Sequence, residues 1–262
     1  MSEFVDIGVN LTSKSLLRDL EGVMQRAADA GVRQMVVTGT SVTTTGQALE
    51  LCTRFPDRLV FTCGVHPHHA DEWDAISPDS LRKLAQHPAA RAIGETGLDF
   101  NRSYSPHEAQ ETAFRRQLEL AGELEMPVFC HQRDAHPRFV EILRDYRDRV
   151  GKIVVHCFTD SRVALLDYLD LDCHIGITGW ICDERRGLEL QQLVKLIPAE
   201  RLMLETDAPY LLPRDLRPRP SQRINEPAYL PHIFGAVARH RGQNAEELAA
   251  QCLANSREFF NL

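Results

Sequence analysis

The sequence predicts an α/β protein whose 262 residues form a single (β/α)8 TIM barrel. Three observations predict this fold. Eight short apolar runs recur along the chain, the segments between them carry helix signals, and no linker or change of composition interrupts residues 1–262. A length of about 250 residues is typical of one such barrel. An open doubly wound sheet is the main alternative.

The eight apolar runs are rich in β-branched residues, and each closes on a polar residue or a glycine. Their first residues lie 21 to 36 positions apart, which leaves room for a strand, a loop and a crossover helix. The runs stay apolar throughout because strands of a parallel sheet are buried on both faces. The predicted strands are Val5–Asn10, Gln34–Thr40, Leu59–His66, Arg91–Asp99, Pro127–His131, Lys152–His156, Cys173–Gly179 and Leu202–Asp207.

Helix signals lie between these runs. Ser105, Pro106 and Glu108 form a predicted capping box, and Pro127 ends the helix that follows. Ser77 with Pro78 predicts the start of another helix, and Asn244 with Glu247 predicts the start of the last one.

Composition excludes several classes of protein. The formal net charge of −7 argues against a protein that coats nucleic acid or anionic membranes, because such proteins need a positive face. Charged residues near the start leave no room for an apolar signal core, and no run of 18 apolar residues occurs. Seven scattered cysteines without a CxxC pair are typical of reduced thiols. We therefore expect a cytoplasmic protein without a membrane partner.

Polar side chains gather at the carboxyl ends of the predicted strands, where active sites of barrels are built. Any one of them has a structural explanation, such as a hydrogen-bonded histidine or a capping aspartate. Burying so many imidazoles and carboxylates around one mouth is costly unless a charge compensates them. A divalent cation is the simplest compensation. The segments are Asp6–Asn10, Gly64–His68, Gly94–Asp99, His131–Asp134, His156–Thr159 and Glu205–Pro209.

These segments, read in order, resemble the signatures of TatD-type metal-dependent deoxyribonucleases. The resemblance runs from Asp6 to Phe260, and the Ile177–Gly187 segment is most similar to the TatD subgroup itself. It implies an amidohydrolase-like barrel and a Mg²⁺- or Mn²⁺-dependent nuclease; the ligand types leave Zn²⁺ open. One departure stands out. Many relatives open with Asp-x-His-x-His, whereas this chain has Gly8 and Asn10 at the two histidine positions.

The resemblance also implies roles for individual residues. The expected metal ligands are Glu95, His131, His156 and Asp207, with Glu95 and Asp207 as the catalytic pair. Asp207 ligates the metal or accepts the proton of the attacking water. Separately from the resemblance, the need to orient the phosphate and offset its charge leads us to expect contacts from Asn10, His66, His68, Arg133 and Arg214. Gly94 and Gly97 flank Glu95 and permit close approach of backbone or substrate, or simply relieve crowding.

A basic loop suggests how an acidic chain meets nucleic acid. Residues 213–223 contain four arginines and one aspartate directly after the last predicted strand, and Arg185 and Arg186 follow the strand before it. Trp180 or Tyr210 is suited to stacking a base. A narrow mouth with local positive charge favours a single-stranded end, and the resemblance implies 3′→5′ exonuclease action on DNA, with RNA open. We expect a monomer with a role in DNA repair or nucleic-acid turnover.

Two other functions stay open at this point. Similar barrels and ligands serve metal-dependent hydrolases of small amides, esters or lactones. Loss of the two histidines of the first strand is also compatible with a non-catalytic barrel that binds a partner. The arginine-rich loop favours the nuclease over the first, and the retained ligand set argues against the second.

Overall fold

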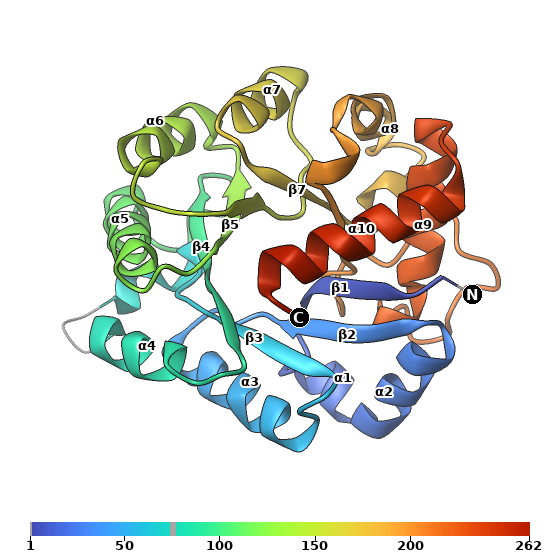
Figure 1. Cartoon of the computed structure of the whole chain (residues 1–262), viewed down its shortest axis with the longest axis horizontal. Helices are drawn as coiled ribbons and strands as arrows, with labels where there is room; N and C mark the ends of the chain where they lie inside the picture. The colour runs from blue at the N-terminus through green and yellow to red at the C-terminus, as the bar shows by residue number, and fades with distance from the viewer. Residues whose placement is uncertain (1, 74–76) are drawn as a thin grey trace. The chain divides into compact units, whose positions relative to one another are not determined.

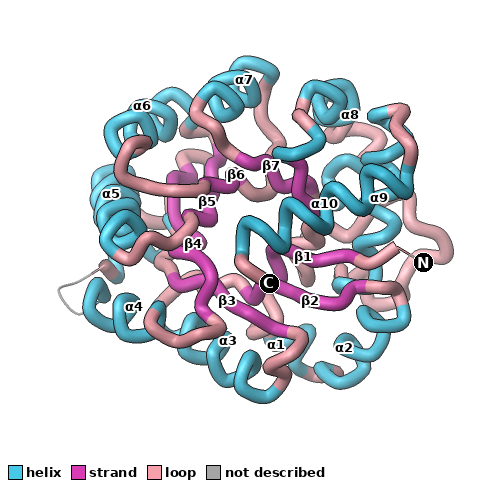
Figure 2. Tube along the Cα trace, viewed as in Figure 1, coloured by secondary structure: helices cyan, strands magenta, loops and turns pink. Residues whose placement is uncertain are grey.

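The computed structural model describes residues 2–73 and 77–262. They form two compact units, each assembled from segments that are separate in the sequence. Unit 1 comprises the residues up to 37, 157–162 and 175–262, and unit 2 comprises 38–156 and 163–174. Strands and helices alternate along the chain (Figure 2), as the spacing of the apolar runs predicts.

Unit 1 holds two parallel strand pairs, β1 with β2 and β7 with β8. The last strand also lies beside the first, because Val9 bridges to Ala208 and the Asn10 N–H donates to the Ala208 carbonyl at 2.8 Å. Adjacency of the first and last strands is expected of a barrel and not of an open doubly wound sheet. The strands are β1 (Phe4–Val9), β2 (Val32–Val37), β7 (His174–Ile177, whose first residue belongs to unit 2) and β8 (Leu202–Leu204).

Helices of unit 1 cover these strands. The last helix, α10, packs on β1 and β8, and Figure 1 shows it lying across β1. The side-chain amide of Asn255 fixes α10 by donating to the carbonyls of Ala199 and Leu202 at 2.7 and 2.8 Å. The helices are α1 (Lys14–Leu17), α2 (Leu20–Asp29), α8 (Leu188–Leu193), α9 (Leu230–Arg241) and α10 (Ala245–Phe260).

Unit 2 holds four strands that pair in parallel and in chain order, from β3 to β6. This sequential order again differs from the switched order of a doubly wound sheet. Its strands are β3 (Leu59–Cys63), β4 (Ala90–Asp99), β5 (Val128–Arg133) and β6 (Ile153–Val155). Its helices are α3 (Val42–Arg54), α4 (Ser77–Ala85), α5 (His107–Glu123), α6 (His136–Tyr146) and α7 (Arg162–Asp170, whose first residue belongs to unit 1).

All eight predicted strands are present, and several are shorter than predicted. His66, His156 and Asp207 therefore lie just beyond β3, β6 and β8. Ser77 begins α4, and the Asn244 side chain caps α10 by accepting from the N–H groups of Glu246 and Glu247. Among residues 2–73 and 77–262, no helix is long and apolar enough to cross a membrane.

The capping box predicted at Ser105 is wrong. Helix α5 begins at His107 with Pro106 as its N-cap, and no side chain caps it. The Ser105 hydroxyl instead donates to the Asp71 carboxylate at 2.8 Å. The Ser105 hydroxyl therefore bonds an aspartate distant in sequence, although the local sequence pattern predicts that it caps α5.

Gly94 and Gly97 let β4 approach β5 closely. Their φ angles of +139° and +141° are rarely adopted by other residues. A Cβ at these positions would lie 2.2 Å from the Phe129 carbonyl oxygen and 1.9 Å from that of His131. The close approach expected at these glycines is thus made by backbone, and it sets Glu95 beside β5.

Candidate metal centre

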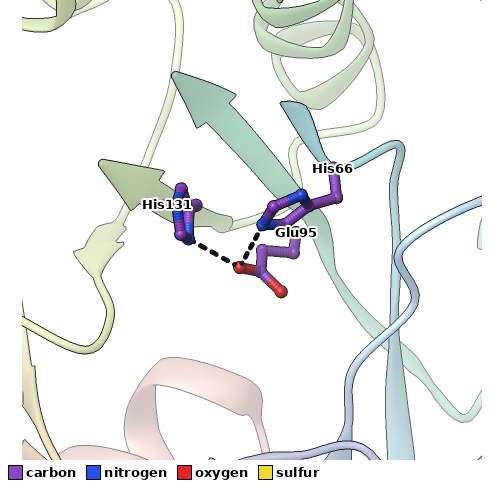
Figure 3. Close-up of side chains that lie close together, drawn as sticks. All are labelled: His66, Glu95 and His131. Carbon is purple, nitrogen blue, oxygen red and sulfur yellow. Dashed lines mark hydrogen bonds and ion pairs between the residues drawn. The ribbon is translucent and has the colours of Figure 1, made fainter. Parts of the chain in front are cut away.

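One carboxylate oxygen in unit 2 lies within hydrogen-bonding range of three imidazoles. Glu95 Oε1 is 2.8 Å from His156 Nε2, 3.0 Å from His131 Nδ1 and 3.2 Å from His66 Nε2. Glu95 lies on β4 and His131 on β5, whereas His66 and His156 follow β3 and β6. Figure 3 shows His66 and His131 pointing at the Glu95 carboxylate. Four neighbouring strands thus deliver this glutamate–histidine cluster from their carboxyl ends.

Glu95 is buried, so its negative charge needs compensation from neighbouring groups. Glu95, His66 and His156 are buried, so an isolated carboxylate would be poorly solvated there. Burial acts to raise the pKa of Glu95, but electrostatic interaction with the His156 and His66 imidazoles and hydrogen bonds from His131 and His156 hold that pKa well below its ordinary value. The glutamate is therefore ionised and available to a cation.

A backbone N–H two residues further along the chain determines which nitrogen of His66 carries the proton. His66 Nδ1 accepts the backbone N–H of His68 at 3.0 Å, so this nitrogen carries no proton. Burial lowers the pKa of His66 to about 4, which keeps the ring neutral. A neutral imidazole with a bare Nδ1 must carry its proton on Nε2, the nitrogen that faces Glu95. A ring nitrogen of His66 lies close enough to donor atoms of Glu95 and His131 for the three residues to share a metal ion. With its proton on Nε2, however, His66 donates a hydrogen bond to Glu95 and does not offer that nitrogen to a metal.

His131 has a different environment, because carboxylates lie at both of its nitrogens. Nδ1 faces Glu95, and Nε2 lies 3.4 Å from Asp99 Oδ2. Burial opposes protonation of the ring, but hydrogen bonds to Asp99 and Glu95 raise the pKa of His131 overall. A metal bound at Nδ1 would leave the ring proton on Nε2, facing Asp99, which is the carboxylate–histidine–metal arrangement common in metal sites.

Asp99 joins a fourth histidine to the glutamate–histidine cluster. Its Oδ2 is 2.7 Å from His68 Nε2, and its Oδ1 accepts the N–H groups of Asn101 and Arg102 at 3.0 and 2.8 Å. Burial acts to raise the pKa of Asp99, but the bonds from His131 and His68 hold it well below its ordinary value. The exposed ring of Tyr104 lies edge-on to His68, with 4.7 Å between centroids.

The end of β1 in unit 1 is built differently. Asp6 is fully buried and accepts from Thr206 twice, at 2.5 Å from the hydroxyl and 2.9 Å from the N–H. Burial raises the pKa of Asp6 to about 8, although the bonds from Thr206 oppose that rise. Asn10 Nδ2 donates to Asp207 Oδ1 at 2.9 Å, and Asp207 has a φ of +53°. An amide thus contacts Asp207 at the second of the two positions where the resemblance leads us to expect a histidine.

Three arginines of the predicted basic region gather around one aspartate of unit 1. Nε atoms of Arg185, Arg186 and Arg214 lie 3.8, 2.9 and 3.6 Å from the Asp183 carboxylate. Arg214 also pairs with Glu184 at 3.1 Å, and the Arg186 guanidinium lies 4.3 Å from the centre of the Trp180 ring. Three of the predicted basic residues therefore lie close together, and acidic partners already neutralise part of their charge.

The predicted site residues fall into both units. Unit 2 brings Glu95, His131, His156 and His66 into contact and adds His68 through Asp99. Arg133 ends β5 with an exposed side chain. Asn10, Asp207 and Arg214 belong to unit 1.

Sequence reasoning gave no role to two residues of this region, Asp99 and Tyr104. Asp99 is four residues after Glu95, and alternation along a strand places both on one face, so that signal was present. Tyr104 lies in the loop after β4, where no periodicity predicts an orientation.

The donor set fits a divalent cation. One ionised carboxylate, an imidazole whose second nitrogen faces a carboxylate and a second imidazole are ordinary ligands of Mn²⁺ and Zn²⁺, and the carboxylate also suits Mg²⁺. Arranged around one point, they allow Lewis-acid activation of water and of a phosphoryl oxygen.

Comparison with known proteins identifies the family. The model of the TatD related DNase family matches residues 5–261. A 3′-5′ ssDNA/RNA exonuclease TatD from Erwinia tasmaniensis is 54% identical over 98% of this chain and 99% of its own length.

Solved structures agree. A TatD homologue from Escherichia coli superposes with a TM-score of 0.90 at 27% identity, covering 99% of this chain and 98% of its own. An uncharacterized amidohydrolase from Saccharomyces cerevisiae superposes with a TM-score of 0.88 at 24% identity over 99% of this chain and 100% of its own, which supports the fold alone. These similarities confirm the predicted (β/α)8 barrel class. The chain belongs to the TatD related DNase family of phosphodiester hydrolases.

Proposed function

We propose that this protein is a divalent-cation-dependent exonuclease that removes nucleotides from the 3′ end of single-stranded DNA and also accepts RNA. The observation that carries the proposal is the glutamate–histidine cluster, in which the ionised Glu95 lies within 3.0 Å of nitrogens of His131 and His156. The polymer and the direction come from the relatives that are described as 3′-5′ ssDNA/RNA exonucleases at 51–54% identity.

The proposed metal ligands are Glu95 Oε1, His131 Nδ1 and His156 Nε2. We exclude His66 from this set because its Nε2 carries the proton that its Nδ1 lacks. The mixture of imidazole and carboxylate favours Mn²⁺ or Mg²⁺ for activity and allows Zn²⁺ to bind. A cation held there supplies Lewis-acid activation of the water and of the scissile phosphate.

The remaining residues of unit 2 orient the substrate. The His66 Nε2–H, turned from Glu95 to a phosphate oxygen, donates a hydrogen bond without changing protonation state. Arg133 and His68 offer further donors to the phosphate. We assign to Asp99, whose Oδ2 lies 3.4 Å from His131 Nε2, the role of favouring the tautomer with a bare Nδ1 once a cation is bound.

Asp207 and Asn10 keep their predicted roles as part of this proposal. Asp207 accepts the proton of the attacking water or adds a carboxylate ligand, and the amide of Asn10 contacts phosphate in place of a metal. Their mutual hydrogen bond of 2.9 Å supports this pairing, since one partner fixes the orientation of the other.

Tyr104 supports the preference for a single strand. Its side chain is 64% exposed, and its ring edge rests on His68, which is hydrogen-bonded to the Asp99 carboxylate. An unstacked base of a single strand can lie on such a ring, whereas a paired base cannot. Tyr210 is similarly exposed in unit 1, at 60%, and provides the matched comparison.

The test uses end-labelled single-stranded DNA, duplex DNA and RNA, each incubated with Mg²⁺, Mn²⁺ or EDTA. Wild type should give a ladder that shortens from the 3′ end, strongest on single strands and lost in EDTA. Glu95→Gln should be inactive, whereas Glu123→Gln, which alters an exposed carboxylate, should match wild type. Equal cleavage by Glu95→Gln protein, purified identically, would refute the proposed centre.

We further propose that residues 1–262 act as one catalytic domain and as a monomer in the cytoplasm, in DNA repair or nucleic-acid turnover. None of the seven cysteines, all of which lie in the described part of the chain, forms a disulfide, and six of them are buried, which suits a reducing compartment. Gel filtration with light scattering of the full chain tests the monomer, and a mass of twice 29.7 kDa would contradict it.

A further inference from the structure

A second group of potential metal ligands lies in unit 1, formed by Cys182, Asp215 and His232. Each offers one donor atom, and the three atoms lie within 4.8 Å of one another. Cys182 ends a short 3₁₀ helix (η2, Gly179–Cys182), Asp215 lies in the loop between β8 and α9, and His232 is in the first turn of α9. No step of the proposed nuclease reaction uses any of them.

The chemistry of this group differs from that of the glutamate–histidine cluster. A thiolate, an imidazole and a carboxylate form a donor set that binds Zn²⁺ and rejects Mg²⁺, because sulfur is a poor ligand for hard cations. Three protein ligands leave the fourth position of a tetrahedral ion open to water. The distribution of donors over three separate elements is also what a metal needs to tie those elements together.

The local contacts are compatible with an ion. His232 Nε2 lies 2.7 Å from Asp215 Oδ1, so these two donor atoms are already side by side and a cation would replace the proton between them. Cys182 is 4% exposed, which shields a metal–sulfur bond from solvent. Arg239 Nη2 is 3.9 Å from Asp215 Oδ2, but this side chain is largely exposed and can turn to solvent when a cation arrives.

We propose that Cys182, Asp215 and His232 form a Zn²⁺ site that clips the β8–α9 loop to η2 and α9. On binding, the Cys182 thiol loses its proton to solvent and the His232 ring keeps its proton on Nδ1, so that the sulfur, the bare Nε2 and the Asp215 carboxylate can bond to the metal. Because Arg214 directly precedes Asp215, the clip also restrains the arginine expected to meet phosphate. The site shares no residue with the glutamate–histidine cluster, so its metal binding can be measured without nuclease activity.

The test is a titration of metal-stripped full-length protein with Co²⁺, a spectroscopic stand-in for Zn²⁺. Glu95→Gln protein is used so that the glutamate–histidine cluster contributes little binding. One equivalent of Co²⁺ should produce the near-ultraviolet absorption of a cobalt–thiolate bond, and Zn²⁺ should displace it. Cys182→Ser should abolish that absorption, whereas Cys252→Ser, which changes a buried cysteine of α10, should leave it intact. Cobalt bound without the thiolate absorption, or an unchanged spectrum in Cys182→Ser, would overturn the proposal.

His232→Asn provides a second variant that keeps the thiol and retains a polar side chain. It should weaken Co²⁺ binding at least about tenfold. Trypsin supplies a readout of the clip in the same protein. Zn²⁺ should slow cleavage after Arg214 and Arg223 in the Glu95→Gln background, and His232→Asn should remove that protection. Cleavage at equal rates with and without Zn²⁺ would contradict a clip.

Discussion

Glu95 of unit 2 and Asp6 of unit 1 are both buried carboxylates of the parallel strands, yet their surroundings stabilise opposite protonation states. Imidazoles surround Glu95 and hold its pKa well below the ordinary value, despite burial. Asp6 receives only neutral donors from Thr206 and Gly8, and burial raises its pKa to about 8. The difference indicates that unit 2 is prepared to hold a cation, whereas the end of β1 is a neutral hydrogen-bonded junction with β8.

The residues at positions 8 and 10 explain this difference. Gly8 and Asn10 offer only a backbone N–H and a side-chain amide at the end of β1. The Asn10 amide supports Asp207 but is a weaker metal ligand than an imidazole. We therefore expect one tightly held cation at the glutamate–histidine cluster and, at most, a loosely held second ion.

The largest effect is expected when each of the two buried carboxylates is replaced in turn by the corresponding amide. Glu95→Gln removes the anion that binds the cation, and kcat/KM on single-stranded DNA should fall at least about a thousandfold, or about 4 kcal/mol. Asp6→Asn preserves a neutral junction and should retain activity within about tenfold. Steady-state kinetics with saturating Mn²⁺ makes the comparison. Comparable losses in both variants would remove the proposed distinction between the units.

The second effect is on stability as a function of pH. Folded Asp6 keeps its proton up to about pH 8, whereas the unfolded chain loses it near pH 4. The folded state therefore binds more protons across this window, so this group's contribution to stability falls as pH rises, by at most about 1.4 kcal/mol per pH unit. Asp6→Asn should flatten that decline. Urea unfolding at several pH values between 5 and 8 tests it, and parallel curves for wild type and variant would show that Asp6 does not titrate there.

The third effect concerns the support of His131. Asp99→Asn replaces the acceptor beside Nε2 with an amide, so the ring loses its preference for the tautomer with a bare Nδ1. Metal affinity should fall about 10- to 100-fold, with recovery of rate at high Mn²⁺. Asp71→Asn, which alters the aspartate bound by Ser105, serves as the control. A loss that added metal does not restore would assign Asp99 to a different role.

A smaller effect separates the two exposed tyrosines. Tyr104→Ala should raise KM for single-stranded DNA about tenfold, because a base stacked on an aromatic ring contributes about 1–3 kcal/mol. Tyr104→Phe should behave as wild type, and Tyr210→Ala should have less effect than Tyr104→Ala. Hydrolysis of a small phosphodiester without a base should be unchanged in every variant. The reverse ranking of the two alanine variants would move the base-stacking position to unit 1.

The smallest effect is expected at Arg214. The Arg214 guanidinium is already paired with the Asp183 and Glu184 carboxylates, so its attraction for a substrate phosphate is weakened. Arg214→Gln should raise KM a few-fold. It should also reduce, by about one, the magnitude of the slope of the logarithm of the DNA-binding constant plotted against the logarithm of the salt concentration. Binding measured at several salt concentrations tests this, and an unchanged slope would place phosphate contact elsewhere.

Much of the fold was predictable because each element is encoded locally. Apolar runs located all eight strands, and Asn244 located the start of α10. The helix start near Ser105 failed in detail because the distant Asp71 captures the hydroxyl. Segment order predicted that Glu95, His131 and His156 would meet, since neighbouring parallel strands end together.

Other features of the sites depend on contacts that no sequence pattern reveals. The proton on His66 Nε2 follows from a backbone bond made two residues later. Cys182, Asp215 and His232 are separated by more than thirty and by seventeen positions, and only the path of the β8–α9 loop brings them together.

The most direct test of the glutamate–histidine centre is Mn²⁺ binding followed by electron paramagnetic resonance. Free Mn²⁺ is titrated into metal-stripped wild type, Glu95→Gln and Asp6→Asn protein without nucleic acid. Wild type and Asp6→Asn should bind one Mn²⁺ tightly, and Glu95→Gln should bind it at least about a hundredfold more weakly. Equal Mn²⁺ affinity in wild type and Glu95→Gln would contradict the account.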